Sequence, residues 1–169
     1  MAVVDSASLI YLTKSSCKEI LVKTYSQVSI TPAVYREVVV GGKRYPDSGV
    51  VEKNVKEGRI RVENPSKILS VYPNNLGAGE MEALSLAFEK KAMLITDDVH
   101  AIRAALLHGV HVRTSETVLI EAYIRGVISR LEDLKDKLTA LIKHKAVRPD
   151  VYVLITTLLK VLEEERGEG

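Results

Sequence analysis

Short apolar segments alternate with longer segments of helical periodicity along most of the chain. The apolar segments have the length of strands, and the longer ones carry hydrophobic residues at three- and four-residue spacing. We expect strands near residues 2–4, 28–30, 60–62, 92–96 and 110–112. Short strands that alternate with helices are typical of an α/β fold with a parallel sheet, so the pattern predicts that fold class.

Capping and breaking residues set where the helices between these strands begin and end. Thr31 followed by Pro32 predicts a helix start, and that helix runs to Val40 before two glycines. Further helices are expected over residues 6–12, 17–25, 50–57, 80–91, 98–107 and, in several pieces, after 114. We expect residues 43–49 to form a loop.

The chain after residue 126 has helical periodicity and no strand pattern. Ser129 with Glu132 predicts a capping box, and Pro149 predicts the start of the last helix. The apolar stripe of that helix consists of Val151, Leu154, Ile155, Leu158, Leu159 and Leu162. The stripe predicts packing on the core, and a dimer interface is its second interpretation. For a chain of 169 residues we expect an α/β domain at 1–126 and a helical extension at 127–169 packed on the same domain.

Two of the predicted strands end in aspartate. Asp5 follows the first strand, and Asp97-Asp98 follow the fourth. In open α/β sheets ligands bind beyond the carboxyl ends of the strands, so one interpretation is a shared site there. The other is that each aspartate only caps the helix that follows it. The coincidence of two such strands favours the shared site.

Glu80 begins the helix that follows the Gly77-Ala78-Gly79 turn, which we interpret as letting this helix approach closely. On a helical wheel Glu80 shares the sheet-facing side with Leu84 and Ala87, whereas Glu82 points the other way. A buried carboxylate is costly without a partner, so we interpret Glu80 as a site residue and Glu82 as solvent-facing. The alternative for Glu80 is a first-turn acid favoured by the helix dipole.

Glu37 lies in the apolar helix that begins at Pro32, where a carboxylate needs either a partner or a metal ion. Both interpretations stay open.

Several carboxylates in one crevice repel one another unless cations neutralise them. Oxygen ligands select Mg²⁺ or Mn²⁺ rather than zinc. One such ion activates water for phosphodiester hydrolysis, and a second about 4 Å away stabilises the leaving oxygen.

Composition narrows the class of protein only slightly. The chain is 46% hydrophobic and 27% charged, which is ordinary for a soluble globular protein. Its single cysteine excludes an internal disulfide, no apolar run is long enough to span a membrane, and the first residues lack the basic region of a signal peptide. We therefore expect a cytoplasmic protein with no membrane partner. The net charge of +2 permits nucleic-acid binding without arguing for it.

Four ordered motifs resemble those of PIN-domain nucleases: DSASLIYL after the first strand, TPAVYREVV, LGAGEMEALSLAFEKKAMLITDD and AIRAA. The likeness includes the toxins of VapBC toxin–antitoxin pairs and is closer to a prokaryotic PIN subfamily with a GxGExEA element. It covers nearly the whole chain. It implies a three-layer α/β/α fold and a Mg²⁺- or Mn²⁺-dependent endoribonuclease whose products carry a 5′-phosphate and a 3′-hydroxyl. It also implies RNA as substrate, a homodimer and, for a toxin, a small antitoxin.

The resemblance places the family's acids on particular residues of this sequence. The implied catalytic residues are Asp5, Glu37, Glu80 and Asp98. The implied metal ligands are Asp5, Glu80, Asp97 and Asp98. The residues expected to orient a ligand, water or phosphate are Ser6, Ser8, Thr96 and Arg103. Glu80 is one methylene longer than the aspartate usual in the toxins, and Arg103 has a surface ion pair as its alternative role.

Other classes of function fit the sequence less well. A PIN module that binds RNA or a protein without cleaving is the second interpretation, since a fold does not fix a function. A receiver-like domain lacks the expected lysine after a late strand. His100, His108 and His111 have neither a cysteine nor the spacing of a zinc site. The basic run at residues 143–148 is interpreted as solvated surface, with RNA contact as its alternative.

Overall fold

The computed structural model describes residues 1–15, 17, 19–42, 46–71, 75–145, 147 and 149–167. Within these residues one parallel sheet has five strands in the order β3-β2-β1-β4-β5. The strands are β1 (Ala2–Val4), β2 (Val28–Ile30), β3 (Ile60–Val62), β4 (Met93–Ile95) and β5 (Val112–Arg113). The predicted α/β class with a short parallel sheet is confirmed.

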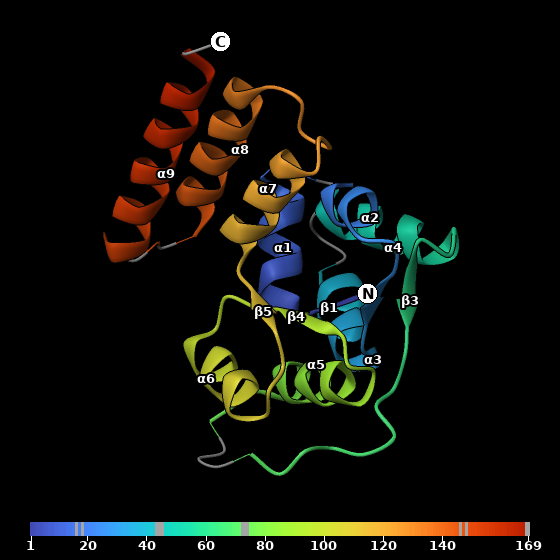
Figure 1. Cartoon of the computed structure of the whole chain (residues 1–169). Helices are drawn as coiled ribbons and strands as arrows, with labels where there is room; N and C mark the ends of the chain where they lie inside the picture. Colours follow the sequence, from blue (N-terminus) through green and yellow to red (C-terminus); the bar gives the residue numbers. More distant parts are fainter. Residues whose placement is uncertain are drawn as a thin grey trace.

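Helices cover both faces of this sheet, which gives the predicted three layers (Figure 1). One face is covered by α1 (Ser6–Lys14), α2 (Ile20–Thr24), α4 (Pro46–Lys56) and α7 (Ser115–Ile124). The other face is covered by α5 (Ala78–Glu89) and α6 (Val99–Leu107). Side chains alternate along β1, so Ala2 and Val4 join the first core and Val3 joins the second.

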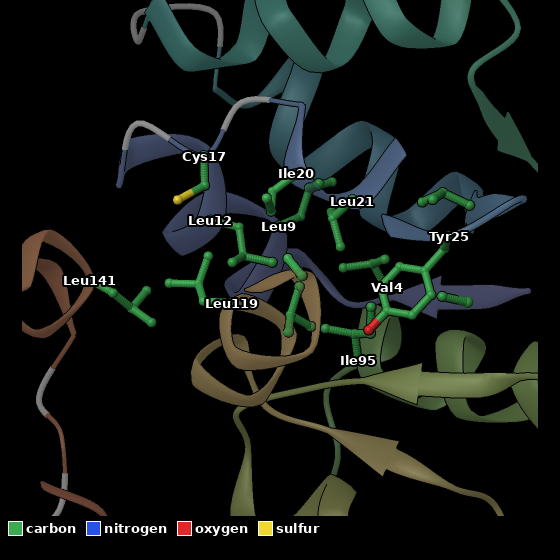
Figure 2. Close-up of a cluster of buried hydrophobic side chains, with 14 of the residues drawn as sticks. Val4, Leu9, Leu12, Cys17, Ile20, Leu21, Tyr25, Ile95, Leu119 and Leu141 are labelled. Carbon is green, nitrogen blue, oxygen red and sulfur yellow. The ribbon is translucent and has the colours of Figure 1, made fainter. Parts of the chain in front are cut away.

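The larger core lies between the sheet and the helices α1, α2 and α7 (Figure 2). Leu9 and Leu12 of α1 and Leu119 of α7 are at most 2% exposed. Burying a leucine side chain of this kind contributes roughly 1.5–3 kcal/mol to stability. This packing holds the start of α1, and therefore Asp5, in a fixed position at the end of β1.

The helical extension packs on the same face through α8 (Leu131–His144). Its buried residues are Leu131, Leu134, Leu138 and Leu141, which form one stripe that contacts α1 and α7. The last helix, α9 (Pro149–Gly167), begins at the predicted proline and lies along α8 (Figure 1). Ile155 of α9 is buried as predicted for the stripe, but Leu154 is 67% exposed. Among the described helices, none combines the length and apolar character that a membrane span needs.

The structure differs from the predicted elements mainly at helix starts. α4 begins at Pro46, so residues 46–49 are helical rather than loop, because proline is favoured at the first helical position. The rest of that predicted loop, residues 43–45, lies outside the described residues. The predicted capping box of Ser129 and Glu132 is wrong, since Arg130 is the N-cap residue of α8 and makes no capping hydrogen bond. β5 begins at Val112, two residues later than expected.

Candidate functional site

Polar residues follow β1, β4 and β5 where these parallel strands end at one edge of the sheet. Asp5 follows β1, Asp97 follows β4 by two residues, and Glu116 lies just beyond β5 in the first turn of α7. Hereafter the carboxyl ends of these three strands, with Asp5, Asp97 and Glu116, are called the acidic edge. This is the edge at which open α/β sheets bind their ligands.

Asp5 is buried at this edge and is 1% exposed. It caps α1, since its Oδ1 accepts a hydrogen bond of 2.8 Å from the Ser8 amide, while its Oδ2 is buried without a hydrogen-bond partner in the described structure. The pKa of Asp5 is raised from 3.8 to about 6, mainly by burial and to a smaller extent by the charge of Asp97. Interactions with Thr96 and Ser8 offset part of this increase in the pKa. Capping alone explains Oδ1 but leaves Oδ2 unexplained.

Asp97 is held in place by the start of α7 and by a lysine. Its Oδ1 accepts hydrogen bonds of 2.9 Å from the Ser115 amide and 2.7 Å from the Lys145 ammonium, and its Oδ2 accepts one from the Ser115 hydroxyl. Its neighbour Asp98 instead caps α6 through a bond of 2.8 Å from the Ala101 amide. Of the two adjacent aspartates, Asp97 therefore belongs to the acidic edge and Asp98 is engaged by the following helix.

Glu37 and Ser6 meet at the side of the acidic edge next to β2. The Ser6 hydroxyl donates a hydrogen bond of 2.7 Å to Oε2 of Glu37, so the acid in this apolar helix has a hydroxyl partner. The predicted helix from Pro32 to Val40 is continuous, but after α3 (Pro32–Tyr35) it widens into the π-helical turn η1 (Arg36–Val40). Such turns are frequent at functional sites. Since Ser6 follows Asp5 directly, this pair adjoins the acidic edge.

The start of α5 approaches this pair because Gly79 has no side chain. A Cβ at Gly79 would lie 3.3 Å from the Ser6 Oγ and 3.5 Å from Oε2 of Glu37. This close approach agrees with the interpretation of the glycine turn. A groove of about 520 Å³ is lined by Ser6, Ala7, Ala33, Arg36, Glu37 and residues 77–80.

Glu80 and Glu82 are placed differently from the wheel-based prediction. Glu80 lines the groove, but its Oε2 accepts a hydrogen bond of 2.6 Å from the Gly77 amide and so caps its own helix. The prediction that Glu82 faces solvent is wrong. Glu82 is half-buried and accepts a bond of 3.1 Å from the Ala33 amide at the start of α3. The helical-wheel prediction for Glu82 is wrong because α3 packs against α5 on the side where Glu82 projects.

The other residues expected to orient a ligand are divided between the site and the surface. Thr96 and Ser8 are fully buried beside Asp5, and the Ser8 hydroxyl has no hydrogen-bond partner in the described structure. Thr96 accepts a bond of 3.2 Å from the Asp98 amide. Arg103 is exposed on α6. The structure thus brings Ser6, Ser8 and Thr96 next to acids of the site.

Two charged residues of the site were missed by the sequence analysis. Glu116 is 2% exposed, and Lys145, interpreted as solvated surface, has a side chain only 14% exposed. The Lys145 ammonium lies 2.7 Å from both Glu116 and Asp97. Glu116 had a usable signal, since like the two aspartates it follows a predicted strand. Lys145 had none, because its contacts depend on how α8 docks.

The donor atoms at this edge fit a hard divalent ion, although the side chains do not enclose one. Among the described residues, no three His, Cys, Asp or Glu side chains are grouped so that they could hold a metal ion. The donors are carboxylate and hydroxyl oxygens, which suit Mg²⁺ and Mn²⁺. A cation beside the buried, unpartnered Oδ2 of Asp5 would supply the interaction that this atom lacks. The oxygen donors at this edge therefore suit either ion.

Comparison with known proteins gives the family. A family model of the PIN domain matches residues 1–163 of the chain. The chain belongs to the PIN-domain family. Among solved structures, this PIN domain is similar to a PilT N-terminus domain protein from the hyperthermophilic archaeon Sulfolobus solfataricus P2, with 23% sequence identity and a TM-score of 0.49 over 72% of this chain and 92% of that chain. No curated protein matches it.

Membership in the family confirms the resemblance seen in the sequence and gives a general class of function. PIN domains are generally nucleases and generally use divalent metal ions. In this PIN domain the acidic edge and the adjoining groove are where the expected acids Asp5, Glu37 and Glu80 lie.

Proposed function

We propose that this PIN domain is an endoribonuclease that hydrolyses RNA phosphodiester bonds at the acidic edge with Mg²⁺ or Mn²⁺. The observation that carries the proposal is the buried Asp5 carboxyl group, whose Oδ2 has no hydrogen-bond partner in the described structure while Asp97 adds negative charge nearby. A buried group of this kind is costly unless a ligand completes it. Strongly perturbed groups of this kind occur preferentially at functional sites.

Each residue has a role that follows from its contacts. Asp5 keeps Oδ1 on the Ser8 amide and offers Oδ2 as a ligand, while Ser6 orients the Glu37 carboxylate. The divalent ion, when bound, supplies Lewis-acid activation of water and neutralises phosphate charge. Arg36 lines the groove beside Glu37 and offers a bidentate partner for an RNA phosphate. Asp98 remains a proposed ligand through its Oδ2, since the Ala101 amide donates to its Oδ1.

The third acid of the family pattern falls on Glu80, which lines the groove beside Glu37, and Glu82 is its alternative. The Glu80 carboxylate caps its own helix, whereas Glu82 spans from α5 to the start of α3. Replacing each by glutamine separates the two roles. We expect Glu80→Gln to reduce cleavage more than Glu82→Gln, and the reverse order would move the assignment to Glu82.

Cleavage of a labelled single-stranded RNA with Mn²⁺ or Mg²⁺ tests the proposed activity. Asp5→Asn keeps the cap of α1 and removes one ligand charge, so we expect cleavage to fall on the order of 100-fold or more, with an unchanged circular dichroism spectrum. Glu132→Gln, an exposed acid on α8, is the matched control and should cleave like the wild type. Equal cleavage by Asp5→Asn and wild type would refute the proposal that cleavage takes place at the acidic edge.

A PIN module that binds RNA without cleaving it is the second candidate. One observation favours it: Lys145 already pairs with Asp97 and Glu116, and no described trio of acids is arranged around an ion. Retained RNA binding with no Mn²⁺ uptake by calorimetry would support this candidate over the nuclease.

The expected partners follow from the family resemblance. We propose a toxin role with a small antitoxin, and a homodimer formed through the exposed apolar residues Tyr152, Val153 and Leu154 of α9. Light scattering on the wild type and on Leu154→Asp tests the dimer. A dimer that the substitution dissociates is expected, and a wild-type monomer would exclude it.

A further inference from the structure

Lys145 reaches from the helical extension into the acidic edge. It is the C-cap residue of α8, and its ammonium lies 2.7 Å from Oδ1 of Asp97 and 2.7 Å from Oε1 of Glu116. The three side chains are 14%, 4% and 2% exposed. This is a buried ion triad, and a buried lysine between two carboxylates remains charged because the carboxylates favour its protonated form.

The triad leaves carboxylate oxygens without partners. Oε2 of Glu116 and Oδ2 of Asp5 are both buried and have no hydrogen-bond partner among the described residues. Asp97 connects the two, since it faces the ammonium and also acts electrostatically on Asp5. The acidic edge therefore has two places for a cation. One lies between Asp97 and Glu116, and the other lies beside Asp5.

Charge balance distinguishes these two places. Three ionised carboxylates and one ammonium leave two negative charges, which a single divalent ion neutralises. In sites that use two metal ions, the second ion stabilises the leaving oxygen. Here a lysine already occupies the corresponding kind of position, and it is the C-cap residue of α8, whose leucines are buried.

We propose that Lys145 is a resident cation of the acidic edge, whose ammonium fills the position between Asp97 and Glu116, so that the folded protein takes up one divalent ion, beside Asp5, rather than two. This inference rests on the proposed metal-dependent function. Lys145 is then a positioning residue that sets the number of ions and the orientation of Asp97.

Mn²⁺ binding in the absence of RNA tests this inference, by calorimetry together with electron paramagnetic resonance of free Mn²⁺. We expect one ion in the wild type, two in Lys145→Met, and one in Lys145→Arg, which keeps the positive charge. Lys143→Met, two residues away and exposed, is the matched control and should bind one. The double variant Glu116→Gln/Lys145→Met removes the second cation position and should again bind one Mn²⁺ ion.

The outcomes separate this inference from the proposed function. A Lys145→Met protein that binds one ion as tightly as the wild type would make Lys145 a purely structural tether and overturn the inference, while the metal-dependent function would stand. A wild type that binds two ions would also overturn the inference alone. A wild type that binds none would overturn the metal-dependent function as well.

A second measurement needs no variant, in case Lys145→Met does not fold. Reductive methylation followed by mass spectrometry should modify the exposed Lys143 and leave Lys145 unmodified, both without and with saturating Mg²⁺. If Mg²⁺ makes Lys145 reactive, the divalent ion displaces the ammonium, and the inference is wrong.

Discussion

At the scale of single residues, the charge of Asp5 has an energetic consequence that depends on pH. Burial raises its pKa from 3.8 to about 6, so the folded state binds this proton more tightly than the unfolded state. The resulting stability is fully present below about pH 4 and is lost as the pH rises through about 6. Asp5→Asn, which keeps the cap, should therefore raise the free energy of unfolding at pH 7.5 in EDTA by up to about 3 kcal/mol.

Urea unfolding at pH 4, 6 and 7.5 measures this effect, and the difference between variant and wild type should vanish near pH 4. Asp98→Asn is the control, since Asp98 is also an N-cap but is only half-buried. Saturating Mn²⁺ should stabilise the wild type at pH 7.5 and leave Asp5→Asn unchanged. An Asp5→Asn protein no more stable than wild type at pH 7.5 would show that the buried Asp5 charge does not destabilise the folded state.

Cys17 is a buried thiol and serves as a reporter of unfolding. It is 5% exposed, its thiol donates to the Ser15 carbonyl oxygen over 3.0 Å, and burial raises its pKa from 9.0 to about 11. The thiolate fraction at pH 8 is then about 100-fold below that of an unfolded chain. We expect a disulfide reagent to react with native protein at least about 100-fold more slowly than in denaturant. Equal rates would mean that this part of the core opens freely.

Residues of the candidate site could be predicted from the sequence only where their role depends on neighbouring positions in the chain. Asp5 and Asp98 were recognisable because capping and strand ends are read from neighbouring positions. Glu82 was misplaced because its direction depends on a helix far away in the sequence. Lys145 was missed for the same reason, since its partners Asp97 and Glu116 are brought to it by the packing of α8.

At the scale of elements, the approach of α5 to α1 and η1 depends on Gly79. The methyl group of Gly79→Ala would lie 3.3 Å from the Ser6 Oγ, which would have to move by a few tenths of an ångström and so disturb its hydrogen bond to Glu37. We expect RNA cleavage to fall about 10-fold, because small misplacements of reacting groups reduce rates strongly. Stability should change little, since alanine favours the helix while the contact opposes it.

Gly49→Ala in α4 is the control for this substitution. A Cβ at Gly49 has no atom within 4 Å, and the position is exposed and helical. We expect the free energy of unfolding to rise by about 0.5–1 kcal/mol and cleavage to stay unchanged. Gly79→Ala with wild-type cleavage would show that the close approach does not position Glu37.

The strands and most helices were predictable because apolar periodicity records which face is buried. All five predicted strands are present, and Thr31 with Pro32 begins a helix as expected. The π-helical turn at Arg36–Val40 was not predictable, because its residues have the same apolar pattern as an α-helix. The wider turn is visible in the bond of 2.8 Å from the Gly41 amide to the Arg36 carbonyl, which spans five residues.

At the scale of the whole molecule, the extension and the α/β part share one core. Leu138 of α8 is 1% exposed and belongs to the same cluster as Val4 of β1. We expect Leu138→Ala to cost about 2–5 kcal/mol and to speed amide exchange in β1 as much as in α8, because the two parts unfold together. Thr139→Ala, at an exposed position of the same helix, should change neither the stability nor the amide exchange of β1. Faster exchange confined to α8 and α9 would indicate an extension that unfolds alone.

The central position of β1 also determines when this protein can fold during its synthesis. Ala2 pairs with Val28 on one side and with Met93 on the other, so β1 cannot complete its pairing until β4 has been made. Sheets built from such distant pairings fold slowly, and a nascent chain emerges residue by residue. Asp5 therefore leaves the ribosome long before Asp97, Glu116 and Lys145 exist beside it. The acidic edge is assembled only after Lys145 has been made, and a nascent chain that stops before this residue does not contain it.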